Sequence, residues 1–190
     1  MDDNEYYYNY YRTKYNESVS QINQCDNAIS GYRSRLQVVV NEITSLSASI
    51  RSVDNAIEQL KGILDCEDDI NDKLGEVNTK MSDASINYTG MVSSSNVSNK
   101  NLTDVFSQET STTKTKISNA FQTVRTKKTT LESQVAEKRR KLTQYENEKT
   151  TLNRNIYTEQ TERNEWARKK NDYWWSMEYY RRKMEQDNWW

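Results

Sequence analysis

The fold is decided by residues 22–64, which read INQCDNAISGYRSRLQVVVNEITSLSASIRSVDNAIEQLKGIL. Apolar residues recur every seventh position in this stretch, beginning at Ile22 and ending at Leu64. A second row of mostly apolar residues, three positions further on, runs from Cys25 to Leu60. Spacing of seven residues sustained over many heptads is typical of a left-handed coiled coil. These residues therefore predict a long helix with one apolar seam.

Both rows extend towards the N-terminus, and the spacing changes at the other end. The first row comprises Tyr8, Tyr15, Ile22, Ile29, Leu36, Ile43, Ile50, Ile57 and Leu64, and the second comprises Tyr11, Ser18, Cys25, Tyr32, Val39, Leu46, Val53 and Leu60. After Leu60, a new row is formed by Ile63, Ile70 and Val77, with Leu74 and Met81 as its companion row. This change predicts a three-residue discontinuity of the stammer kind in the seam.

A second heptad run occupies residues 117–184 without a change of phase. One row comprises Ile117, Val124, Leu131, Lys138, Tyr145, Leu152, Glu159, Trp166, Tyr173 and Tyr180, and the other comprises Phe121, Lys128, Val135, Leu142, Lys149, Ile156, Arg163, Lys170, Met177 and Met184. The charged members have two interpretations. Their long side chains could reach water from a thin two-helix seam. Alternatively, the apolar stripe of this helix is partly shared with another chain. We favour this interpretation, because two helices alone leave their apolar residues partly exposed to water.

The two runs are separated by residues 86–104, which read INYTGMVSSSNVSNKNLTD. Serine, asparagine and threonine cap helices and form turns. We therefore expect an all-α protein, a long antiparallel helical hairpin of coiled-coil type, with its reversal near residues 87–96. The N-terminal arm is residues 1–86, the turn region 87–104 and the C-terminal arm 105–190. Asn101 or Thr103 is the expected N-cap of the second arm, with Ser94 as the alternative.

Composition supports continuous helix. The chain has no proline and only four glycines, the two residue types that disfavour helix most. Disorder is a poor interpretation, because the net charge is −1 and the chain holds 13 tyrosines and 5 tryptophans. Residues 1–90 carry 15 acidic and 8 basic side chains, whereas residues 91–190 carry 13 acidic and 19 basic ones. This asymmetry favours pairing of one arm with the other.

The sequence gives little support to catalysis or metal binding. It has no histidine, and therefore neither an imidazole base nor a histidine ligand. Residues 65–76 have the acidic spacing of an EF-hand loop, but Ile70 stands where that loop needs glycine. Cys25 and Cys66 are expected to be small residues on the seam side. We therefore expect no enzyme activity, no cofactor and no metal site.

The segment MDDNEYYYNYY at the N-terminus has neither the basic region nor the apolar core of a cleavable signal peptide. The longest run of aliphatic residues, 38–40, is far shorter than the ~20 apolar residues that span a bilayer. We expect a cytoplasmic protein that does not insert into membranes. Any export would use a route without a cleavable signal peptide.

Aromatic residues gather at the two ends of the sequence. Residues 1–15 hold six tyrosines, and residues 166–190 hold all five tryptophans. A hairpin brings these segments together, and tryptophan, tyrosine and arginine are enriched in binding hot spots. The predicted partner-binding residues are Trp166, Tyr173, Trp174, Trp175, Tyr179, Trp189 and Trp190. Basic runs at 138–141, 168–170 and 181–183 raise nucleic acid as an alternative ligand, which the near-neutral chain disfavours.

Two helical arms joined at Tyr88-Thr89-Gly90 resemble the WxG-type helical hairpins of type VII secretion systems. The pattern is most similar to the YwqH-like small proteins, with Tyr88 at the tryptophan position of the turn motif and Gly90 at its glycine. The resemblance implies a bacterial targeting partner or chaperone that binds the helical domain of an LXG-type toxin or a second small helical protein. The alternative function is a structural coiled-coil scaffold or tether that self-associates as a homo-oligomer.

Overall fold

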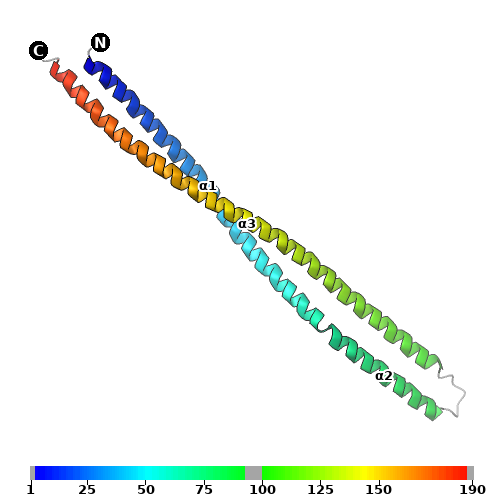
Figure 1. The fold of residues 1–190 in the computed structure, drawn as a ribbon. Helices are drawn as coiled ribbons and strands as arrows, with labels where there is room; N and C mark the ends of the chain where they lie inside the picture. Colours follow the sequence, from blue (N-terminus) through cyan, green and yellow to red (C-terminus); the bar gives the residue numbers. More distant parts are fainter. Residues whose placement is uncertain (1–2, 93–99, 188–190) are drawn as a thin grey trace. The chain divides into compact units, whose positions relative to one another are not determined.

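The computed structural model describes residues 3–92 and 100–187, except for the side chains of residues 85–86, 88–92, 100–103 and 187. Every described residue other than Cys66 lies in one of three helices. These are α1 (Asp3–Asp65), α2 (Glu67–Val92) and α3 (Lys100–Asp187), drawn in Figure 1. The predicted all-α class is therefore confirmed for the described part of the chain.

The helices belong to two compact units. Unit 1 contains residues 1–46 and 141–190, and unit 2 contains residues 47–140. In unit 1, Tyr7 contacts Tyr180 and Asp26 pairs with Arg163, so the start of α1 runs antiparallel to the end of α3 (Figure 1). In unit 2, the rest of α1 and α2 lie beside the first part of α3. Each unit thus holds two antiparallel helical arms, as the predicted hairpin requires.

The predicted heptad rows form the seams of both units. With the exception of Lys149, every residue of the two rows between Tyr8 and Leu64 and of the two rows between Ile117 and Met184 is buried or half-buried. The most buried side chains are those of Ser18, Cys25, Ile29, Val39, Ile50, Phe121, Val135 and Leu152. We therefore use heptad letters below. On α1, position a is the row from Tyr8 to Leu64, and on α3 it is the row from Phe121 to Met184, with position d three residues later.

The predicted slip of the heptad phase after Leu60 is wrong. Its new row is exposed to water, with exposures of 48% at Ile63, 40% at Ile70 and 49% at Val77. Leu74 and Met81 are half-buried and continue the original d row instead. These two residues lie on the seam in either register, so their spacing alone does not decide between the registers. The isoleucine row occupies position g and flanks the seam.

The chain has a real irregularity nearby, at Cys66. The amide of Cys66 donates to the carbonyl of Ile63 at 3.3 Å. This bond spans three residues instead of the four of an α-helix, so the turn is tighter. The amide of Ile70 then donates to the carbonyl of Cys66 at 3.1 Å, which restores the helical pattern. Asp65 lies three and four residues before Asp68 and Asp69, a spacing at which like charges disfavour a continuous helix. As members of the first turn of α2, Asp68 and Asp69 are favoured by the helix dipole.

The reversal of the chain begins later than the sequence predicted. Helix α2 continues through Tyr88 and Gly90 to Val92, and α3 begins at Lys100. Residues 87–92 and 100–104 of the predicted turn region are therefore helical, and Asn101 and Thr103 lie inside α3 rather than at its N-cap. Ser94 and the rest of the reversal lie outside the described residues. One glycine, costing about 1 kcal/mol, does not stop a helix that gains a hydrogen bond with each added residue.

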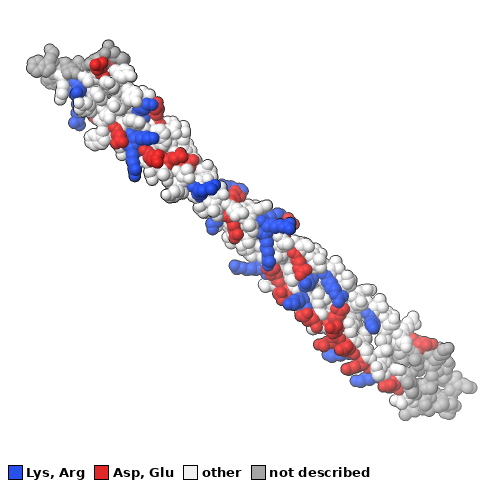
Figure 2. Space-filling view, viewed as in Figure 1, with Lys and Arg blue, Asp and Glu red and all other residues white. Residues whose placement is uncertain are grey.

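Ion pairs across the seams follow the predicted charge asymmetry. Basic residues of α3 pair with acidic residues of α1 and α2 in Arg163–Asp26 at 2.6 Å, Arg139–Asp54 at 3.0 Å and Arg125–Glu67, and Arg35–Glu148 at 2.6 Å has the reverse polarity. Figure 2 shows acidic and basic side chains intermingled along the helices. Because these side chains are largely exposed, each pair contributes only about 0–1 kcal/mol. The pairs therefore favour one register more than they hold the helices together.

Several charged residues of the α3 seam find partners inside the chain. The ammonium of Lys138 donates to the hydroxyl of Ser49 at 2.6 Å, and Lys128 pairs with Glu132 at 2.7 Å. Arg163 reaches Asp26 from its seam position. These contacts give Lys138, Lys128 and Arg163 polar partners without a further chain. They favour the interpretation that the long charged side chains reach out of a thin two-helix seam. They do not favour our prediction that the apolar stripe of α3 is shared with another chain.

Gly31 offers a simple test of helix continuity. It lies in the middle of α1, and an added Cβ would meet no atom within 4 Å. Alanine has the higher helix propensity, so Gly31→Ala is expected to raise the free energy of unfolding by about 0.5–1 kcal/mol. Urea denaturation followed by circular dichroism measures this change. A loss of stability would show that the backbone at Gly31 is not ordinary helix.

Candidate functional site: the aromatic end of unit 1

The first turns of α1 carry more aromatic residues than a seam can bury. Tyr8 and Tyr11 occupy seam positions and are half-buried. Tyr6, Tyr7 and Tyr10 stand at positions f, g and c, and all three are exposed. Because a helix turns about 100° per residue, five tyrosines within six residues must surround most of it. Some of their rings therefore face water.

The end of α3 repeats this pattern on the opposite arm. Tyr173 and Tyr180 lie at position d and are half-buried. Trp174, Trp175 and Tyr179 stand at positions e, f and c, where they are exposed. The rings of Trp174 and Trp175 meet edge to face, with their centroids 4.7 Å apart.

Tyr180 joins the aromatic residues of the two arms. Its ring stacks on Tyr7 with centroids 5.1 Å apart and on Tyr11 at 5.8 Å, and it meets Tyr179 edge to face at 5.1 Å. Tyr11 also lies 6.4 Å from Tyr173. Such ring pairs stabilise a structure by about 0.5–1.5 kcal/mol beyond their buried area. The inner rings therefore hold this end of unit 1 together.

The outer tyrosines of α1 attach to this centre by ring contacts, and Trp175 lines the same groove as Tyr179. Tyr6 meets Tyr7 edge to face at 5.4 Å, and Tyr10 meets Tyr11 at 5.2 Å. We define the aromatic end as the exposed residues Tyr6, Tyr7, Tyr10, Trp174, Trp175 and Tyr179, supported by the inner residues Tyr11, Tyr173 and Tyr180. The six exposed residues leave 39–64% of their surface in water.

The exposed area is large for a chain of this size. At about 200 Å² for each aromatic side chain, half-exposure of six residues leaves roughly 600 Å² of aromatic surface in water. The total is shared between the outer surfaces of α1 and α3; the largest single apolar patch on a typical monomer covers roughly 300–600 Å². A standard protein interface buries about 800 Å² on each partner. The rings on one arm could therefore supply part of one interface.

Two shallow grooves lie on the outer surfaces of this end. A groove of about 350 Å³ on α3 is lined by Trp175, Glu178, Tyr179, Arg182, Lys183 and Gln186. Another of about 390 Å³ on α1 is lined by Tyr6, Asn9, Tyr10, Thr13, Lys14 and Glu17. Each lies along a single helix face, with aromatic rings spaced four residues apart. Such spacing suits a partner that lies along the helix.

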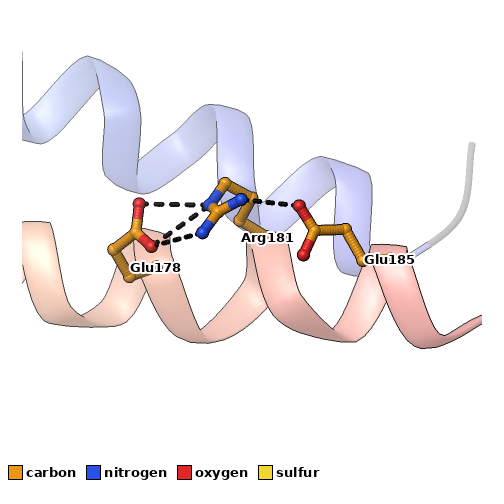
Figure 3. A network of polar contacts seen from close by, with 3 residues as sticks. All are labelled: Glu178, Arg181 and Glu185. Carbon is orange, nitrogen blue, oxygen red and sulfur yellow. Dashed lines mark hydrogen bonds and ion pairs between the residues drawn. The ribbon is translucent and has the colours of Figure 1, made fainter.

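The charges of the α3 groove are organised around Arg181. Its guanidinium pairs with Glu178 at 2.9 Å and with Glu185 at 2.5 Å, as Figure 3 shows. The hydrogen bond to Glu178, followed by the charges of Glu178 and Glu185, raises the pKa of Arg181. Lys183 lies 4.9 Å from the centre of the Tyr179 ring, over its face. Arg181 thus shares one positive charge between two carboxylates, and the groove is lined by charges of both signs, Glu178 beside Arg182 and Lys183.

The predicted site residues divide into three groups. Trp174, Trp175 and Tyr179 lie on the exposed surface, as a binding role requires. Trp166 and Tyr173 are half-buried, with Trp166 beneath the ammonium of Lys169 at 4.2 Å and Tyr173 beside Tyr11. Trp189 and Trp190 lie outside the described residues.

The sequence-based site omitted the exposed tyrosines of α1. Tyr6, Tyr7 and Tyr10 lie within two ring contacts of Tyr180, and they contribute about half of the exposed rings. Their failure to fit the heptad seam was the signal that could have found them. An aromatic residue that lies outside a seam does not contribute to the packing of the two helices. It is therefore a candidate for a surface role.

A second cluster, around Cys25, could be considered as a metal site. The thiol of Cys25 and carboxylate oxygens of Glu159 and Glu162 lie within 4.8 Å of one another. Burial raises the pKa of Cys25, and its hydrogen bond to Glu159 raises it further. Cys25 lies in the α1 seam and Glu159 in the α3 seam, whereas Glu162 is exposed. The pairing of the two seams accounts for the proximity of Cys25 and Glu159.

Among the described residues, none of the three helices has a stretch long and apolar enough to cross a membrane. Comparison with protein-family models, curated protein sequences and solved structures finds no match to this chain.

Proposed function

We propose that this chain is a non-catalytic interaction protein that binds another helical protein through the aromatic end. One observation carries the proposal: six aromatic side chains of the two arms leave 39–64% of their surface in water at the same end of unit 1, which together amounts to roughly 600 Å². Tryptophan and tyrosine bury large rigid surfaces at low entropic cost. They also dominate the residues whose truncation costs most binding energy.

The form of the surface favours a helical partner. Trp175 and Tyr179 lie four residues apart on one face of α3, and Tyr6 and Tyr10 have the same spacing on α1. A partner helix that lies along such a face meets side chains at this interval in each turn. We therefore favour contact between helices over insertion of a small ligand.

The resemblance to type VII secretion proteins supplies a partner to test, the helical domain of an LXG-type toxin. A second small helical protein is the other partner of this class. The support is the sequence pattern of two arms around Tyr88 and Gly90. Because these two residues lie in α2 rather than in a turn, the aromatic end carries more of the proposal than the turn motif does.

The test is co-purification of the full chain with proteins encoded by neighbouring genes, followed by calorimetric titration. The double variant Trp175→Ala/Tyr179→Ala is expected to weaken the complex at least about tenfold, because truncated hot spots typically cost 2 kcal/mol or more. Tyr157→Ala is the matched control. Tyr157 also lies on α3 in unit 1 and is 71% exposed, but it lies outside the aromatic end.

The control is expected to bind within about twofold of the original chain, with the same far-ultraviolet circular dichroism for all variants. Equal losses in the two variants would contradict a role of the aromatic end. Concentration-dependent self-assembly without any complex would favour the scaffold function instead.

A further inference from the structure

One flank of the unit 2 seam is charged and the other is largely apolar. Asp54 and Arg139 both stand at position e and pair at 3.0 Å, so the two rows at position e share one flank. The rows at position g therefore share the other flank. On α1 and α2 the row at g comprises Ala56, Ile63, Ile70, Val77 and Ala84, and on α3 it comprises Phe106, Thr113, Ala120, Lys127 and Gln134. We call these two rows together the g flank of unit 2.

The g flank contains the exposed isoleucine row. Ile63, Ile70 and Val77 leave 40–49% of their surface in water. Apolar residues at a and d alone are typical of a two-helix coiled coil, whereas an added apolar row at e or g is typical of helices in a larger bundle. The row beside the seam of α1 and α2 therefore indicates a core with more than two helices.

Helix α3 does not cover the end of this row. Because Glu67 pairs with Arg125 and the arms are antiparallel, α2 beyond Leu74 lies opposite residues 107–116 of α3. That segment reads SQETSTTKTK and contains no apolar side chain. The described part of α3 therefore gives Val77 no apolar cover, and a helix of another molecule can supply it.

The order of residues in the row favours a second copy of the chain as that molecule. From Ala56 to Ala84 the row reads alanine, isoleucine, isoleucine, valine, alanine, which is nearly the same in both directions about Ile70. A two-fold interface joins the same surface of two copies, so that residue i meets residue j and j meets i. With the axis at Ile70, this residue meets its own copy and Ile63 meets Val77. Each apolar residue of the row thus meets another apolar residue.

The rim of the flank fits the same axis. Position c borders the row on its outer side and is occupied by Gln59, Cys66, Lys73 and Lys80. The axis at Ile70 places Lys73 against Cys66. It places Lys80 against Gln59, so these lysines do not oppose each other. An axis between Ile70 and Val77 would instead set Lys73 against its own copy.

The size of the flank matches a standard interface. From Ala56 to Ala84 the row is about 42 Å long at 1.5 Å of rise per residue. Two helices, each about 10 Å across, make the flank about 20 Å wide. The resulting area of roughly 800 Å² equals what a standard interface buries on each partner.

We infer that two copies of this chain associate through the g flanks of unit 2, with a two-fold axis at Ile70, and form an antiparallel bundle of four helices. The inference goes beyond the proposed function, because the aromatic end belongs to unit 1. At concentrations below the dissociation constant of the dimer, the chain is a monomer and the row faces water.

The first test is sedimentation equilibrium of the full chain over a dilution series, in which we expect a reversible equilibrium between monomer and dimer. The variant Ile70→Lys/Val77→Lys is expected to raise the dissociation constant at least about tenfold, because it places like charges at the axis. The matched control Thr79→Lys/Ser82→Lys adds the same charges at exposed residues of α2 outside the g flank. It is expected to change the dissociation constant less than about threefold.

The second test locates the axis by disulfide formation in a chain whose exposed native thiol is removed by Cys66→Ser. Ile70→Cys is expected to cross-link two copies under mild oxidation, because residue 70 faces its own copy. Ile63→Cys alone is expected not to, because the two copies of residue 63 would lie about 21 Å apart along the axis. Disulfides join Cα atoms roughly 4–7 Å apart. A mixture of Ile63→Cys and Val77→Cys chains is expected to form the mixed dimer.

Three outcomes would overturn the inference. They are a monomer at every concentration, equal effects of the two lysine variants, and cross-linking of Ile63→Cys as readily as of Ile70→Cys. Far-ultraviolet circular dichroism is expected to be the same for all variants. The Ile70→Lys/Val77→Lys chain is expected to keep its affinity for a neighbour-encoded partner, so failure of the dimer and failure of the proposed function are distinguishable.

Discussion

Replacing Ile50 by alanine is expected to lower the free energy of unfolding by about 2–5 kcal/mol, the range for a buried isoleucine truncated to alanine. Ile50 lies at position a of α1 in unit 2 and is only 8% exposed. Its loss removes apolar contacts and leaves a cavity in a seam that is only two helices wide. Urea denaturation followed by circular dichroism measures the change.

Ile63 provides the matched control, because it is the same residue type on the same helix in the same unit. It is 48% exposed at position g. Ile63→Ala is therefore expected to cost less than about 1 kcal/mol, since about half of the side chain remains in water in the folded state. Equal costs at Ile50 and Ile63 would indicate that the heptad phase does slip after Leu60, contrary to the structure.

Replacing Val39 by aspartate is expected to abolish the pairing of helices in unit 1. Val39 lies at position d and is fully buried. An unpaired carboxylate there costs several kcal/mol, a large part of the roughly 5–15 kcal/mol that stabilises a typical domain. Limited proteolysis and hydrogen exchange of residues 3–46 and 141–187 measure the loss.

Val38 is the control for this variant, because it is the adjacent residue and is 47% exposed. Aspartate and valine have similar helix propensities, so Val38→Asp is expected to change the stability by less than about 1 kcal/mol. Similar proteolysis of the two variants would contradict the position of Val39 in the seam.

The heptad rows allowed the fold to be predicted from the sequence. A seven-residue repeat can be satisfied only by helices that bury one stripe, so rows such as Ile22–Leu64 determine both the class and the buried residues. The repeat failed only near residues 63–81. There, two registers share Leu74 and Met81, and the choice depends on packing against α3 rather than on spacing.

The position of the reversal could not be read with the same accuracy. Turn-forming residues are frequent from Asn87 onward, but their preferences amount to about 1 kcal/mol or less for each residue. A helix that is already formed continues through such residues while each adds a backbone hydrogen bond. Tyr88 and Gly90 are therefore helical in spite of their composition.

The candidate site was predicted in part. Exposed tryptophans such as Trp175 were found because aromatic residues gather at the two ends of the sequence and are enriched in binding hot spots. Tyr6, Tyr7 and Tyr10 could have been added because they do not fit the seam, but their ring contacts with the residues around Tyr180 required the structure.

The claim that the aromatic end binds a protein is tested most directly by hydrogen exchange. The full chain is compared with and without the partner that co-purifies from its gene neighbourhood, and exchange is followed by mass spectrometry. We expect added protection in residues 3–20 and 165–187, which carry the aromatic end, and little change in residues 47–140. Protection confined to residues 47–140, or no protection with any neighbour-encoded protein, would contradict the claim.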